Sequence, residues 1–99
     1  MWSYPPKQLR QRDVEPARVN PDVPGEPLLL KRTGKRLRAL RRGRGLTMAQ
    51  LGSDKRGRVY FERQYVWKME TGRVTPSLAA LAHISKRLGV SLATLLRGL

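Results

Sequence analysis

The chain of 99 residues contains no cysteine, one histidine and only seven acidic residues. The absence of cysteine excludes disulfides, thiol catalysis and zinc sites built on thiolates. A single histidine, His83, gives no histidine-rich metal site. The longest strongly apolar run, residues 28–30, is far too short to span a bilayer, and the N-terminus lacks the basic start and apolar stretch of a signal peptide. We therefore expect one cytoplasmic domain with no metal, no cofactor and no membrane partner.

Positive charge is the main feature that is present. Arginine and lysine together number 21 against 7 acidic residues, which gives a formal net charge of +14. A charge of this size indicates a polyanionic partner, with nucleic acid as the first candidate and an anionic membrane surface as the second. The sequence shows no paired carboxylates on one helix face, no Ser/His/Asp grouping and no glycine-rich phosphate loop. We therefore expect no catalytic residues and no enzyme activity.

The composition changes near Leu30, because six of the seven prolines precede it. Proline fixes φ and has no amide proton, so such a stretch resists helix and central strand. We interpret residues 1–30 as an extended proline-rich arm and residues 31–99 as the folded domain.

Residues 31–99 carry the apolar spacing and capping residues of five short helices, which predict an all-α domain. The first is amphipathic through Leu37 and Leu40 and is expected to end at Gly43 or Gly45.

A second short helix is expected after Thr47, because Thr47 to Gln50 has the pattern of a capping box. Met48 and Leu51 form its inner face. Residues 53–60 are expected to be a loop, with a short strand or wing as the lesser option.

The third helix is expected over about residues 63–71, with Val66 and Met69 facing inward. The fourth is expected to use Thr75 as its cap and to hold Pro76 in its first turn. Ser91 is expected to cap the fifth. Leucine and isoleucine spaced three, three and four residues apart predict the core side of the fourth helix, and His83 is expected on its surface. These core positions are Leu78, Leu81, Ile84 and Leu88.

Six short segments, taken in order and with their spacing, resemble one known family. They are Leu37 to Arg41, Gly45 to Thr47, Gln50 to Gly52, Met69 to Gly72, Thr75 to Leu78 and Leu88 to Leu92. Over residues 34–97 the chain resembles the phage-repressor, Cro-like (Xre-type) helix-turn-helix domain. The resemblance implies an all-α, five-helix, lambda-repressor-like domain that binds double-stranded DNA, here preceded by the extended N-terminal arm.

The resemblance also implies roles for particular residues. It places Arg63, Gln64 and Lys68 at the positions of the third helix that meet base edges. Arginine can bond the O6 and N7 of guanine, and glutamine can bond adenine in a similar bidentate way. It further implies a structural ion pair between Arg41 and Glu70, which would hold the first helix to the third.

Further side chains are expected to contact the DNA backbone. Met48 stands where the family often has a glutamine that holds a phosphate, and the basic residues of the longer 53–60 segment could replace that contact. The expected backbone contacts are Lys35, Arg36, Arg38, Thr47, Lys55, Arg56, Arg58 and Arg73.

Together these patterns predict a sequence-specific transcriptional regulator, most simply a repressor, that acts as a homodimer at the nucleoid. Two alternatives stay open. Residues 1–30 could contact a protein partner such as the transcription machinery, as in an antitoxin or an adaptor. The basic surface could instead bind RNA.

Overall fold

The structure is a computed structural model, and it describes residues 24–99. The expected arm over residues 1–30 therefore lies largely outside the described residues. Within the described part, the chain forms five helices, and an isolated antiparallel β-bridge joins Ser53 to Val59, so the all-α fold class is as predicted. The helices are α1 (Glu26–Gly43), α2 (Met48–Leu51), α3 (Arg63–Glu70), α4 (Leu78–Leu88) and α5 (Leu92–Leu96).

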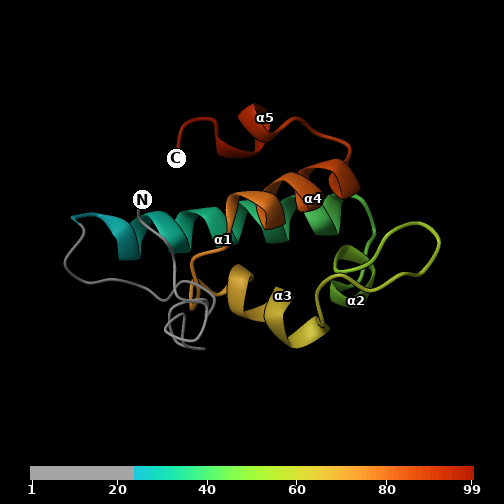
Figure 1. Ribbon diagram of the computed structural model, residues 1–99. Coiled ribbons are helices and arrows are strands. Elements are labelled where there is room, and N and C mark those ends of the chain that lie inside the picture. The colour runs from blue at the N-terminus through green and yellow to red at the C-terminus, as the bar shows by residue number, and fades with distance from the viewer. Residues whose placement is uncertain (1–23) are drawn as a thin grey trace, which may run out of the picture.

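The long helix α1 runs through the middle of the domain (Figure 1). α3 packs against α1 on one side, and α2 packs against both α3 and α4. α5 lies on the other side and contacts α1 and α4. Within residues 24–99 no helix has the length and apolar character that a membrane crossing requires.

One apolar cluster joins all five helices. α1, α2 and α5 each contribute a single leucine to it, while α3 and α4 contribute two residues each. Helices of four to eleven residues are marginal in isolation, so this shared cluster is what stabilises them. Its members are Leu37, Leu51, Val66, Met69, Ile84, Leu88 and Leu95.

α1 begins earlier than the sequence patterns suggested, so residues 26–30 are helical and not extended. Pro27 lies in the first turn, where its missing amide proton would have no intrahelical partner in any case. Glu26, in the same turn, is favourable near the positive end of the helix dipole. Thr33 fits the buried side of α1 because its hydroxyl donates to the carbonyl oxygen of Leu29 at 2.8 Å.

The predicted capping box of α2 is confirmed. The backbone N–H of Gln50 donates to Oγ1 of Thr47 at 3.1 Å, and the backbone N–H of Thr47 donates to Oε1 of Gln50 at 2.8 Å. Both bonds lie within four residues, which explains why the pattern could be recognised locally.

The predicted start of α4 is wrong by two residues. The cap is Ser77, whose hydroxyl accepts from the backbone N–H of Ala80 at 3.0 Å, while Thr75 donates to the carboxylate of Glu26 at 2.9 Å. Leu78 is also not a core residue, because 69% of it is exposed. At 100° per residue it lies about a third of a turn from the buried stripe that includes Ile84.

Candidate nucleic-acid interface

α3 has a buried side and an exposed side. Val66, Met69 and Glu70 face the domain. Arg63, Gln64 and Lys68, the three expected base-reading residues, are all exposed. Within residues 24–99 the side chains of these three residues form no hydrogen bond and no ion pair. The short helix thus presents three polar side chains whose donors are free to meet another molecule.

The orientation of α3 is set by a buried ion pair with α1, of the kind that the family resemblance implied. Nε of Arg41 donates to Oε2 of Glu70 at 2.6 Å, and Nη2 donates to Oε1 at 3.1 Å. Nη1 of Arg41 also donates to the carbonyl oxygen of Leu46 at 2.9 Å. Because a guanidinium is a rigid planar fork, these three bonds hold α1, α3 and the turn before α2 in one arrangement.

Close backbone contact accompanies this pair. Gly34 of α1 faces the C-terminal end of α3, where a Cβ atom would overlap the carbonyl oxygen of Glu70 and lie 2.7 Å from that of Met69. Only glycine lets the two helices approach so closely.

A hollow of about 470 Å³ lies beside the exposed side of α3, and Met48 of α2 contributes to its wall. Glu62 is the N-cap residue of α3, but its side chain makes no capping hydrogen bond. Trp67 is 40% exposed, and the guanidinium carbon of Arg73 lies 4.8 Å from the centre of a Trp67 ring. The wall of the hollow therefore combines the acidic Glu62, the basic Arg63 and the largely apolar Met48 and Trp67.

The expected backbone-contact residues fall into two groups. Arg36 is held by its own domain, because Nη1 donates to the carbonyl oxygens of Leu95 at 3.1 Å and Arg97 at 2.7 Å. We therefore remove it from the candidate interface and assign it to the packing of α5 on α1. The others are exposed: Lys35, Arg38, Thr47, Lys55, Arg56, Arg58 and Arg73.

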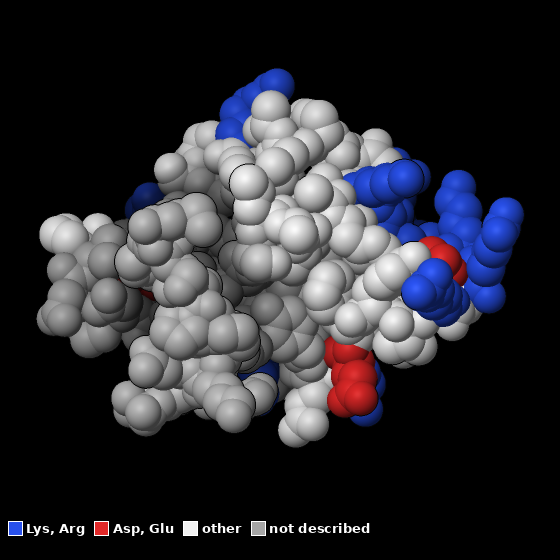
Figure 2. Space-filling model, in the orientation of Figure 1, with Lys and Arg blue, Asp and Glu red and all other residues white. Residues whose placement is uncertain are grey.

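The 53–60 loop connects α2 to α3 and carries three of these basic residues. Oδ1 of Asp54 accepts the backbone N–H groups of Arg56 and Arg58, both at 2.9 Å, and the N–H of Asp54 donates to the carbonyl oxygen of Arg58 at 2.9 Å. These bonds form a compact turn within the expected loop. Figure 2 shows basic side chains gathered at the end of the molecule where this loop projects.

Two residues of α4 next to this loop were not expected to belong to a site. His83 is half-buried, with its ring centre 4.5 Å from that of Tyr60 and 5.5 Å from that of Phe61, so it is not a simple surface residue. Nε of Arg87 donates to the carbonyl oxygens of Gln50 at 3.0 Å and Ser53 at 2.9 Å. His83 and Arg87 are four residues apart and so lie on one face of α4. This spacing is the sequence signal from which a shared site could have been predicted.

Burial lowers the pKa of His83 below its ordinary value of 6.5. The nearby Asp54 carboxylate opposes this change, while the positive charges of Arg87 and Lys86 add to it. A neutral imidazole is therefore favoured at physiological pH. Within residues 24–99 there is no group of three His, Cys, Asp or Glu side chains that could hold a metal ion.

Comparison with known protein families gives a match. The family model described as a helix-turn-helix domain matches residues 32–97, about two thirds of the chain. No curated protein and no solved structure matches the chain. The matched segment includes residues 32–43 of α1, about two thirds of that helix, and the whole of α2 to α5. Helix-turn-helix domains bind DNA by placing the second helix of the motif in the major groove. In this chain α3 is the helix that follows α2.

Proposed function

The chain belongs to the helix-turn-helix domain family, and from this premise we propose that it is a sequence-specific DNA-binding transcriptional regulator. In this proposal α3 lies in the major groove, where Arg63, Gln64 and Lys68 bond to base edges. The backbone contacts come from the exposed residues Lys35, Arg38, Thr47, Lys55, Arg56, Arg58 and Arg73.

The observation that carries the proposal is the exposed side of α3. Its three polar side chains have no partner within residues 24–99, while the opposite side of the same helix is held by Val66 in the core and by Glu70 in a buried ion pair. A helix held firmly against its domain suits direct reading of bases, because its backbone position is set before binding while its side-chain donors stay free to bond.

We propose that the regulator acts as a repressor, since a protein bound over a promoter blocks access of the transcription machinery. In this proposal the concentration of the protein sets the occupancy of the site.

We further propose that the active form is a homodimer, because two-fold-related helix-turn-helix domains read half-sites about one helical turn apart. An apolar hollow of about 370 Å³ supports this assignment, and a second copy of the chain is the occupant that we propose for it. Leu29 and Leu96 in its wall are 46% and 38% exposed. Sedimentation velocity of the wild-type protein is expected to show a dimer, and Leu96→Glu is expected to convert it to a monomer. Binding of a single wild-type copy to a DNA site with two related halves would contradict the dimer.

Selection of bound fragments from random duplex DNA tests the main proposal. The full chain is expected to enrich one sequence, with two related halves, and to bind it about 10³-fold or more tightly than random DNA at the same salt concentration. Structured RNA at equal phosphate concentration serves as the competitor. Equal binding to selected and random duplexes would contradict sequence-specific reading, and stronger binding to the RNA would favour the RNA-binding alternative.

A further inference from the structure

A second strongly charged hollow lies between the 53–60 loop and α4. Its volume is about 520 Å³, and it shares no lining residue with the hollow beside α3. Five of its lining side chains are cationic and one is a carboxylate; Tyr60 and His83 complete the wall. Like charges brought together in this way repel one another, so a bound anion would relieve the repulsion. The charged residues are Lys55, Arg56, Arg58, Lys86, Arg87 and Asp54.

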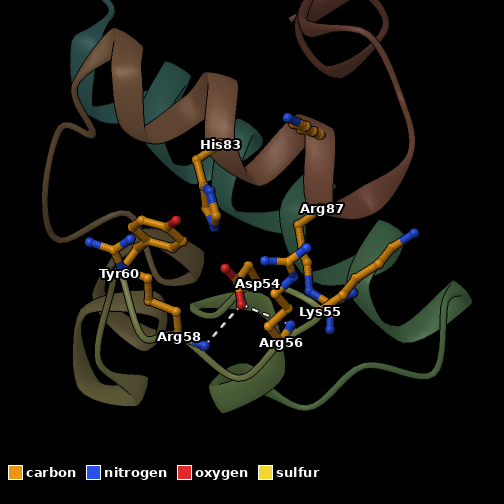
Figure 3. A pocket seen from close by; sticks show the side chains of 8 residues that line it. Asp54, Lys55, Arg56, Arg58, Tyr60, His83 and Arg87 are labelled. Atoms are coloured by element: carbon orange, nitrogen blue, oxygen red, sulfur yellow. Dashed lines mark hydrogen bonds between the residues drawn. The ribbon is translucent and has the colours of Figure 1, made fainter.

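The guanidinium of Arg87 is held in a position from which it can bind an anion. Its Nε donates to the carbonyl oxygens of Gln50 and Ser53, which ties the side chain to the end of α2. The two Nη groups have no hydrogen-bond partner within residues 24–99. Figure 3 shows Arg87 extending from α4 to the loop, where it lies beside Lys55 and Arg56. A guanidinium already fixed in position loses little freedom when it binds a phosphate in a bidentate way.

A second polar group in the hollow also lacks a partner. Nε2 of His83 is buried, and no hydrogen bond from the described residues reaches it. The imidazole points from α4 toward Asp54 and Tyr60 (Figure 3). Buried polar atoms are nearly always paired, so this ring nitrogen at the wall of the hollow is a place where a bound water or ligand would complete a hydrogen bond.

The one carboxylate in the hollow does not neutralise it. Oδ1 of Asp54 accepts two backbone N–H groups of the loop, those of Arg56 and Arg58, and these bonds disperse part of its charge. Asp54 thus holds the turn that presents the cations, and the hollow keeps a net positive charge.

We propose that this hollow is a phosphate-binding site, with Arg87, Lys86 and Lys55 as its main cationic contacts. This site is separate from the exposed side of α3, which we propose to read bases. The phosphate could belong to the DNA backbone flanking the segment under α3, in which case the proposal rests on the proposed function, or to a free phosphorylated small molecule. The recognition chemistry is the same in both cases.

Inorganic phosphate tests the site without DNA. We expect NMR titration of the full ¹⁵N-labelled chain, against sodium chloride at equal ionic strength, to shift the backbone amides of residues 54–58 and the Nε–H of Arg87. A bound phosphate should also raise the pKa of His83, because the protonated imidazole is then favoured.

Matched variants define the site. The double variant Lys55→Gln/Lys86→Gln is expected to weaken phosphate binding about tenfold. Asp54→Asn keeps an oxygen for the two N–H groups and is expected to strengthen binding. The control Arg97→Gln removes one positive charge from the end of α5, which matches the single variant Lys86→Gln, and should leave the affinity unchanged. Equal weakening by Arg97→Gln, or no saturable shift with phosphate or DNA, would overturn the proposal.

A duplex of random sequence distinguishes the two sources. If the duplex shifts the same resonances and Lys86→Gln lowers the slope of log K against log salt by about 1, the site holds backbone phosphate. If phosphate shifts them and the duplex does not, the ligand is a small phosphorylated molecule. Failure of base reading by α3 would leave the inorganic phosphate result intact, so the two proposals fail separately.

Discussion

Arg41 of α1 and Glu70 at the C-terminal end of α3 form a bidentate ion pair in the interior of the domain. The side chain of Glu70 is 1% exposed and that of Arg41 is 10% exposed. The pair connects the longest helix to the helix that carries the base-reading candidates, so it couples the stability of the fold to the orientation of the site.

Removal of one partner of this pair should be costly. Glu70→Gln is expected to lower the free energy of unfolding by about 3–5 kcal/mol, because Arg41 is left as an unpaired buried charge. Urea unfolding monitored by circular dichroism measures the loss. Glu62→Gln, an exposed glutamate with no side-chain capping bond, is the control and should change stability by less than about 0.5 kcal/mol. A similar loss of unfolding free energy in both variants would contradict a stabilising role for the pair between Arg41 and Glu70.

Two glycines of α1 should respond in opposite directions to the same substitution. Gly34→Ala is expected to destabilise the protein by about 1–3 kcal/mol or more, because the methyl group meets the backbone of α3. Gly43→Ala meets no atom within 4 Å and is expected to stabilise the end of α1 by up to about 1 kcal/mol, since alanine favours helix. Thermal unfolding of the two variants makes the comparison; a stable Gly34→Ala would contradict the close approach of α1 and α3.

Alanine variants of the exposed side of α3 should change sequence preference. Arg63→Ala, Gln64→Ala and Lys68→Ala are each expected to lose about 1–3 kcal/mol of discrimination at one position of the selected site, with little change on random DNA. Competition binding to single-base variants of the site measures this. A uniform loss on all sequences would instead identify the altered residue as a backbone contact.

Two arginines of α1, Arg36 and Arg38, should have different roles, one in the stability of the domain and the other in DNA binding. Arg38→Gln is expected to reduce the slope of log K against log salt by about 1, because an exposed cation near phosphate is lost. Arg36→Gln is expected to leave that slope unchanged and to lower thermal stability, because Arg36 holds the carbonyl oxygens of Leu95 and Arg97. Salt titrations of DNA binding and melting curves test both; a reduced slope for Arg36→Gln would return it to the interface.

Stability should depend on pH through His83. Its pKa in the folded protein lies below the ordinary 6.5, so the unfolded chain binds a proton that the folded chain does not. The free energy of unfolding is therefore expected to be highest above pH 6.5 and to decrease as the pH falls below it. Urea unfolding between pH 7.5 and 5.5 in phosphate-free buffer measures the effect. His83→Phe, which keeps an aromatic ring beside Tyr60, should remove it; the same slope in the variant would assign the effect to another group.

Local patterns predicted the elements of the fold well. The capping box at Thr47 and the cap of α5 at Ser91 both follow from hydrogen bonds within a few residues. The family resemblance supplied the pair between Arg41 and Glu70, which no local pattern contains. The predicted start of α1 was wrong, because Pro27 lies in the first turn of the helix, where proline is accepted.

The sequence by itself determined the five-helix order, the caps of α2 and α5 and the excess of positive charge, because each depends on composition or on neighbours along the chain. Only the tertiary structure decided which of several similar side chains stay free for a ligand. Thr75 bonds to Glu26, 49 residues away, and Arg36 bonds to the backbone of Arg97, 61 residues away. Contacts over such separations arise only when the helices pack, so no local spacing reveals them.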